Sequence, residues 1–316
     1  MDTRPERATG LARATGLRKT ARGRSSVDAA GLLDRPSVRQ WLSGVVPAWT
    51  LLHKDSFFAL LRGNLSPDGP MHIQKGLSAD ELSGSSILKN ALALLQAGAT
   101  PDGLKVTAAG NLTRAVVAQF LDTISLPGFS KDNMFHFNKV INEPDFFPLY
   151  FTRELTTFAG LLRRDRKGLR TTRKGLDLIK PENHGALQAH LFSTAFSKMD
   201  IGAFYRRAFD GWPQQHVGLV FWCFSIASSN WEKADRLARS CTLPSEELLL
   251  LPYDMSEFAM EAVILRPLRW FGLADYRSEP IPDSQYLKNR YYRKSDLFDR
   301  FLSFDVVIER PASRNH

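Results

Sequence analysis

One stretch of the chain constrains its fold more than any other, residues 148–179, which read PLYFTRELTTFAGLLRRDRKGLRTTRKGLDLI. Apolar residues recur at helical spacing from Phe151 to Leu162, as expected for one buried helix face. Pro148 suits the first turn of a helix, and Gly160 is placed to end the helix in a left-handed conformation. The stretch therefore predicts a helix that begins near the proline and ends at the glycine.

A short hairpin is expected directly after this helix. Two strands, Leu161–Arg164 and Leu169–Thr172, can pair around the turn at residues 165–168, where Gly168 permits the positive φ that such turns often need. The hydroxyl of Thr172 can then cap a following helix. Helix, hairpin and second helix together resemble the second half of a winged-helix domain.

The hairpin is strongly basic, with seven cations against one acid between residues 163 and 174. In winged-helix domains the helix before the hairpin usually enters a DNA groove, and the hairpin, or wing, lies along the backbone. Arg153 is the one cation on that helix and Glu154 adjoins it, so contact with phosphates is favoured over base reading. The candidate nucleic-acid-binding residues are Arg153, Thr157, Arg163, Arg164, Arg166, Lys167, Arg170, Arg173 and Lys174. The alternative is a solvated hairpin whose charges only maintain solubility.

Two looser versions of the arrangement are expected, in residues 78–126 and 253–308. In the later one, Pro267 is expected to end or kink the leading helix. That helix also carries Glu257 and Glu261, which would repel phosphate, so this unit is interpreted as a docking or packing module.

The segments LKVTAAGNL and LRTTRKGLDL place a hydrophobic residue, a cation, a threonine and a glycine in similar order. Together with RPLRWFGLADYR and YYRKSDLFDRFLSF, they resemble segments of uncharacterised bacterial proteins that contain winged-helix-like repeats. The resemblance covers about half of the chain. Such proteins bring no established activity with them, so the resemblance implies a fold rather than a function.

The positive charge is unevenly distributed. The chain of 316 residues has a formal net charge of +9, of which residues 1–26 supply +5 from seven cations and two acids. The other 290 residues carry 35 cations and 31 acids, a balance of +4. Overall charge therefore says little about nucleic acid, and the local cluster on the hairpin carries that argument.

The predicted fold class is mostly α with small β-hairpins, with winged-helix-like units around a helical middle region. Many aromatic residues between His184 and Leu243, Trp231 included, are expected to form a packed helical core. The expected order is a disordered basic tail (1–26), an N-terminal helical segment (27–77), winged-helix-like unit 1 (78–126), winged-helix-like unit 2 with the basic wing (127–182), an aromatic helical region (183–252), winged-helix-like unit 3 (253–308) and a tail (309–316).

No catalytic signature stands out. The chain has no phosphate-binding glycine loop, zinc-protease motif or nucleophile elbow, and its seven histidines are scattered. Cys223 lies within FWCF, as expected for a buried core thiol, and the two cysteines suggest no disulfide framework, which favours a reducing compartment. No apolar run is long enough to cross a bilayer. These features predict a cytoplasmic protein with no cofactor, no metal site and no membrane partner.

The favoured function is nucleic-acid binding, with DNA as the partner, in a regulator or a mobile-element-associated protein. One alternative is a protein–protein scaffold in which the same units pack on one another, on a protein partner or on further copies of the chain. The other is an enzyme whose site is assembled from distant residues. A non-enzyme is favoured.

Overall fold

The structure is a computed structural model. It describes residues 29–63, 65–66, 68–137, 139–166, 168–205, 209, 211–245, 249, 255–282, 284 and 287–309. The expected N-terminal tail, Lys167 and all but the first residue of the expected C-terminal tail lie outside these ranges.

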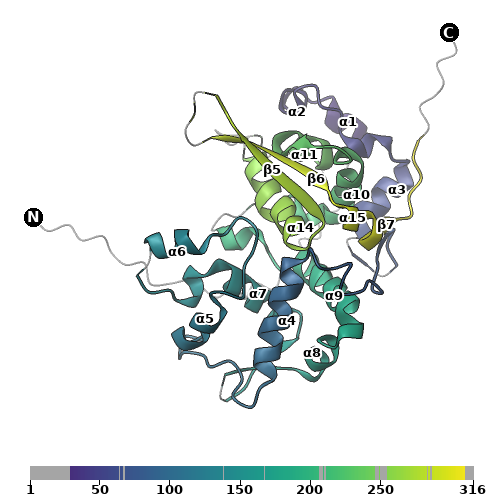
Figure 1. The fold of residues 1–316 in the computed structure, drawn as a ribbon. Coiled ribbons are helices and arrows are strands. Elements are labelled where there is room, and N and C mark those ends of the chain that lie inside the picture. The colour runs from purple at the N-terminus through teal and green to yellow at the C-terminus, as the bar shows by residue number, and fades with distance from the viewer. Residues whose placement is uncertain are drawn as a thin grey trace, which may run out of the picture.

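The N-terminal elements pack on the C-terminal half of the chain (Figure 1). The indole of Trp49 donates a hydrogen bond to the carbonyl of Thr242 at 3.1 Å, and the indole of Trp41 donates to the hydroxyl of Ser256 at 3.2 Å. The first strand pairs antiparallel with the last, Met71 opposite Phe304. The elements are α1 (Ala29–Leu33), α2 (Pro36–Leu42), a 3-10 helix (Ala48–Leu51), α3 (Lys54–Gly63), β1 (Met71–Ile73) and β7 (Leu302–Phe304).

The middle of the chain forms a first set of helices around one hairpin. The two strands of the hairpin pair antiparallel, with Arg163 opposite Arg170. Leu104, which follows the first helix of the set, adds an antiparallel bridge to Leu169. The elements are α4 (Ser86–Ala99), α5 (Arg114–Phe120), α6 (Lys131–Phe137), α7 (Phe147–Phe158), β2 (Leu162–Arg164), β3 (Leu169–Thr171), α8 (Arg173–Leu178) and α9 (His184–Ser197).

The C-terminal half has a related arrangement around a longer hairpin, with a helix that leads into the hairpin and a short helix after it. Its three strands lie in the order β4, β6, β5, so the strand after the first helix again pairs with the last strand of the set. The elements are α10 (Val217–Ala227), β4 (Glu232–Lys233), α11 (Ala234–Cys241), α13 (Ser256–Met260), a π-helix (Glu261–Leu265), α14 (Arg266–Trp270), β5 (Ala274–Pro280), β6 (Lys288–Lys294) and α15 (Asp296–Phe301). The boundary expected between residues 126 and 127 lies in the connection between α5 and α6.

Matching hydrogen bonds close both sets. The helix before each hairpin ends at a glycine with positive φ, Gly160 at +70° and Gly272 at +76°, where a left-handed residue satisfies the last carbonyls. After each hairpin a hydroxyl donates to that glycine's carbonyl, from Thr172 at 2.9 Å and from Ser295 at 2.7 Å. The predicted helix end at Gly160 and the predicted cap at Thr172, which accepts from the Gly175 amide at 3.1 Å, are confirmed.

Pro267 does not end its helix. Helical structure runs from Ser256 to Trp270, with a π-helix over Glu261–Leu265 just before the proline. Proline cannot donate the hydrogen bond that a helix interior needs. The wider turn of the π-helix shifts the hydrogen-bond pattern just before it, so the missing donor interrupts no regular pair. The proline consequently lies in the first turn of α14, where a missing donor is tolerated.

Aromatic rings join the two sets of helices. Trp270 is fully buried, and its ring lies 5.0 Å from Phe151, 5.9 Å from Phe147 and 6.1 Å from Phe129. Phe151 belongs to the helix before the first hairpin, and Trp270 belongs to the helix before the second. The helices that lead into the two hairpins therefore meet in the core.

The coarse fold class is confirmed: the chain is mostly helical, with small antiparallel sheets. Much of the aromatic middle is buried as expected, including Trp212, Phe221 and Trp222. Trp231 is different, because it is only half-buried and lies beside the second hairpin. Across the described ranges, no helix is long and apolar enough to cross a membrane.

His216, at the start of α10, makes the fold sensitive to acid. Its Nδ1 is buried without a hydrogen-bond partner among the described residues, and burial lowers the pKa of the imidazole to about 4. An unfolded histidine has a pKa of about 6.5, so the unfolded chain takes up this proton first as the pH falls. The free energy of unfolding is therefore expected to fall by about 3 kcal/mol as the pH is lowered from 6.5 to 4, because only the unfolded chain binds the proton in that range.

We expect His216→Leu to remove most of this decrease in the free energy of unfolding between pH 6.5 and pH 4. Denaturant unfolding at a series of pH values between 6.5 and 4 measures it in both proteins. Equal pH dependence in the wild type and the variant would contradict the assignment to His216.

Candidate nucleic-acid interface

Exposed cations gather on and beside the first hairpin. We call this surface the basic wing and define it by Arg163, Arg164, Arg166, Arg173 and Lys174, all of which are exposed. No ion pair with another described residue holds any of the four arginines. The Lys174 ammonium lies 3.0 Å from Nε2 of His190. The arginine side chains are thus available to an external anion.

Arg170 anchors the hairpin. Its Nη1 donates to the Thr100 carbonyl at 2.6 Å and its Nη2 donates to the Pro101 carbonyl, so it ties β3 to the loop after α4. Its Nε lies 3.3 Å from Oδ2 of Asp165, the one acid of the hairpin. The acid is therefore engaged by an arginine that is not part of the exposed set.

Backbone contacts fix the hairpin on the helices beneath it. The amide of Leu104 donates to the carbonyl of Leu169 at 2.9 Å, and the amide of Leu169 donates back at 2.8 Å. Gly168 is required beside this bridge, because a Cβ there would lie 2.1 Å from the Leu104 carbonyl oxygen. The Thr171 hydroxyl also donates to the carbonyl of Leu95, on α4, at 2.6 Å. The basic wing is thus presented from a well-supported position.

Arg153 lies elsewhere, in an internal ion pair. Its side chain is 11% exposed, and its Nε lies 2.6 Å from Oε1 of Glu143, which is fully buried. A second ion pair joins it to Glu154. Burial by itself lowers the pKa of the Arg153 guanidinium, but the two glutamates outweigh this and raise the pKa. The structure therefore does not bring Arg153 together with the exposed cations.

The remaining predicted residues have separate positions. Thr157 is exposed at the end of α7, and its hydroxyl donates to the Arg153 carbonyl at 2.8 Å. Lys167 lies outside the described residues. Lys180, which the sequence analysis did not single out, lines a shallow hollow of about 620 Å³ with Arg173, Lys174 and Asp177, and its ammonium lies 2.7 Å from Oδ1 of Asp177.

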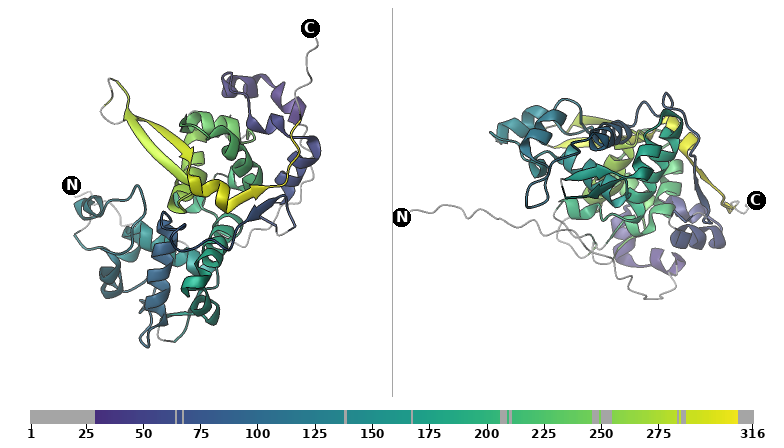
Figure 2. Two further views of the ribbon diagram at one scale, coloured as in Figure 1. Left: turned by 45° about the vertical axis from the view of Figure 1, so that its right-hand side comes forward. Right: turned by 90° about the horizontal axis from the view of Figure 1, so that it is seen from below.

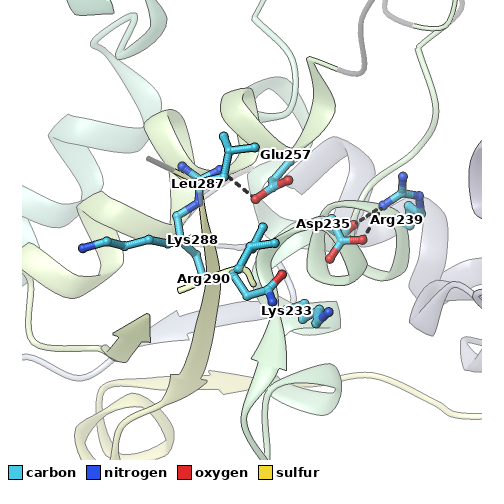
Figure 3. A pocket seen from close by; sticks show the side chains of 9 residues that line it. Lys233, Asp235, Arg239, Glu257, Leu287, Lys288 and Arg290 are labelled. Carbon is cyan, nitrogen blue, oxygen red and sulfur yellow. Dashed lines mark hydrogen bonds and ion pairs between the residues drawn. The ribbon is translucent and has the colours of Figure 1, made fainter. Parts of the chain in front are cut away.

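A second hollow, of about 400 Å³, lies between the turn end of the longer hairpin and residues of α11 and α13 (Figure 3). Arg290 donates to Glu257 at 2.8 Å and Arg239 donates to Asp235 at 3.1 Å, so its acids are engaged by its arginines. Beneath it, Glu261 is buried, and burial raises the pKa of its carboxyl despite ion pairs with Arg290 and Arg266. This hollow has mixed charge, unlike the basic wing.

Nothing in the described part of the chain resembles a metal centre. No group of three or more histidine, cysteine, aspartate or glutamate side chains gathers there. Cys223 and Cys241 are both buried free thiols, and burial raises the pKa of Cys241 to about 12. The exposed arginines of the basic wing are thus the strongest candidate for a functional surface.

Comparisons with known proteins cover the first set of helices. Residues 83–186 match the family model described as the Y4jL N-terminal domain. The chain is also 33% identical over 84 residues to the uncharacterised protein y4jL of Sinorhizobium fredii, an alignment that covers 26% of this chain and 38% of that protein. The chain thus spans well under half the length of this relative. No solved structure matches. The expected resemblance to uncharacterised bacterial proteins is confirmed over this segment, which contains the basic wing.

Proposed function

We propose that this protein binds nucleic acid, with duplex DNA as its partner, through phosphate contacts made by the basic wing. The observation that carries the proposal is the set of exposed arginines on β2, the turn and the start of α8. Of the acids beside them, Asp165 is engaged by Arg170 and Asp177 by Lys180. Arginine side chains held on a fixed hairpin suit a regularly spaced row of phosphates.

The proposed architecture is a pair of winged-helix units. Two features support it: in each set a first helix is followed by a residue or strand that pairs with the second strand of the hairpin, and a later helix leads directly into that hairpin. On this interpretation β2 and β3 are the wing of one unit, and β5 and β6 are the wing of the other. Similar fold does not by itself imply similar function, so the charge on each wing decides its role.

We propose that the protein contacts the sugar–phosphate backbone of DNA and that α7 does not read the bases. That helix buries Phe151, Leu155 and Thr156, and its one cation, Arg153, is held by Glu143. A helix without free donors has little with which to distinguish base pairs. Binding to duplexes of different sequence is therefore expected to be similar. A regulatory or mobile-element role in the cytoplasm is proposed by analogy.

A protein–protein scaffold is the second candidate function. The observation in its favour is the burial of both leading helices, which meet through Phe151 and Trp270. Helices used in this way hold the units together and are not free to enter a groove. Under this alternative the basic wing would face an acidic partner protein.

The test is the affinity of the full chain for a random-sequence duplex, with the triple variant Arg163→Glu, Arg164→Glu, Arg166→Glu beside the wild type. These side chains are exposed and make no ion pair with a described residue, so the variant should fold. Reversing three phosphate-contacting charges is expected to reduce affinity about 100-fold at moderate salt.

The matched control is Lys54→Glu, Lys75→Glu, Arg236→Glu, which changes the net charge equally at exposed positions away from the hairpin. The control should keep an affinity much closer to that of the wild type. Equal losses in the two triple variants would mean that net charge, and not the basic wing, governs binding. Absence of duplex binding by the wild type would leave the scaffold as the better account.

A further inference from the structure

The longer hairpin has two faces that differ in chemistry. Tyr292 is buried, and its hydroxyl donates to the Glu261 carboxylate at 2.8 Å, so its face packs on the helices (Figure 1). Successive residues of a strand point to opposite faces. Tyr291 therefore points outward, and the register places Arg277 of β5 and Lys233 of β4 opposite it. Figure 2 shows that this hairpin extends past the helices on which it packs.

The outward face carries rings and guanidinium groups in contact with one another. The guanidinium carbon of Arg277 lies 5.0 Å from the ring centres of both Trp231 and Tyr291. That of Arg293 lies 4.9 Å from the Trp231 ring. We call this surface the outer sheet face and define it by Trp231, Lys233, Arg277, Tyr291 and Arg293. Each of these residues is at least partly exposed.

Acidic neighbours hold the arginines in place. Nε and Nη2 of Arg293 lie 3.3 Å and 2.7 Å from Oδ2 of Asp275. Nη2 of Arg277 lies 3.6 Å from a carboxylate oxygen of Glu279. These contacts engage only part of each guanidinium edge, so some N–H groups remain free to meet a base or a phosphate. Lys233, which also lines the mixed-charge hollow, has no ion-pair partner among the described residues.

We infer that the outer sheet face binds unpaired bases of single-stranded nucleic acid. Bases outside a duplex stack on aromatic rings and on arginine planes, and a nearby cation neutralises the strand. A duplex keeps its bases stacked within the helix, so it does not offer them to this surface. The inference rests on the proposed function and specifies its partner, a nucleic acid that has both duplex and single-stranded parts.

Base stacking distinguishes this surface from the basic wing. The wing offers exposed arginines but no ring, whereas the outer sheet face has two rings and arginines already paired with acids. Phosphate contact alone would not need the rings of Trp231 and Tyr291 at partly exposed positions. Tryptophan, tyrosine and arginine also dominate protein–protein contacts, and a protein partner is therefore an outcome of the test.

The experiment compares binding of the full chain to a single-stranded oligothymidine with binding to a random-sequence duplex. Trp231→Leu and Tyr291→Leu keep apolar bulk but remove the ring. Each is expected to weaken single-strand binding about 10-fold or more and to leave duplex affinity nearly unchanged. The conservative variants Trp231→Phe and Tyr291→Phe, which keep a ring, should retain most of the affinity.

A second comparison tests the arginines. Arg277→Gln should weaken single-strand binding, whereas Arg236→Gln should not, although each arginine is exposed and lies near a glutamate. Loss of duplex binding in the wing variant with single-strand binding retained would support two separate surfaces. Unchanged single-strand affinity in both leucine variants would overturn the inference. Absence of single-strand binding by the wild type would also overturn it, and a protein partner would then be the better account of this surface.

Discussion

Glu143→Ala is expected to lower the free energy of unfolding by about 3–5 kcal/mol, the usual cost of removing one partner from a buried ion pair. Glu143 is fully buried, and its carboxylate accepts from the Arg153 guanidinium at 2.6 Å and from the Leu112 amide at 2.6 Å. Without it, the guanidinium loses its best partner and a buried N–H is left unpaired. Denaturant unfolding measures the change.

Glu154→Ala is the matched control, because Glu154 also pairs with Arg153 but is partly exposed. Its loss should be about 1 kcal/mol or less. In addition, Glu143→Ala and Arg153→Ala should cost less together than the sum of the two single changes, since they remove the same interaction. Equal costs for the two glutamates would show that the pair does not stabilise the fold as described.

Trp270→Ala is expected to have a comparable effect, about 3–5 kcal/mol. The side chain is fully buried, its ring lies 5.0 Å from Phe151, and its Nε1 donates to the Pro127 carbonyl at 3.3 Å. The substitution opens a cavity where the two leading helices meet. Unfolding followed by circular dichroism should show a lower midpoint.

Trp231→Ala provides the comparison for the same change at a half-buried position. Its cost should be about 1 kcal/mol, since a partly exposed ring leaves little cavity behind. If Trp270→Ala were no more destabilising than Trp231→Ala, the aromatic contacts would not be holding the two halves together.

Local patterns predicted the elements around the basic wing well. The helix, its end at Gly160, the two strands and the cap at Thr172 all depend on residues close together in sequence. Spacing, glycine and a capping hydroxyl are the signals that such elements need. For the later hairpin the sequence alone predicts strands at 273–277 and 291–294, joined by a long loop that contains Pro280 and Pro282. The structure extends the strands to Pro280 and back to Lys288, because a proline is tolerated at the end of an edge strand.

Contacts between distant residues were beyond local patterns. Arg153 was interpreted as a groove-facing cation, since nothing in its own helix shows that Glu143 reaches it. Trp231 was assigned to the core by its aromatic neighbours, yet the pairing of β4 with β6 places it beside Arg293. The bridge between Leu104 and Leu169 likewise joins segments that the sequence treated as separate units.

The most direct test of the proposed function is the salt dependence of duplex binding. For each phosphate that a protein neutralises, the slope of log affinity against log salt steepens by about 0.9. The triple variant at Arg163, Arg164 and Arg166 should therefore have a slope shallower than that of the wild type by about 2.7. Identical slopes for the two proteins would show that these arginines do not contact phosphates, and would contradict the basic wing as a nucleic-acid interface.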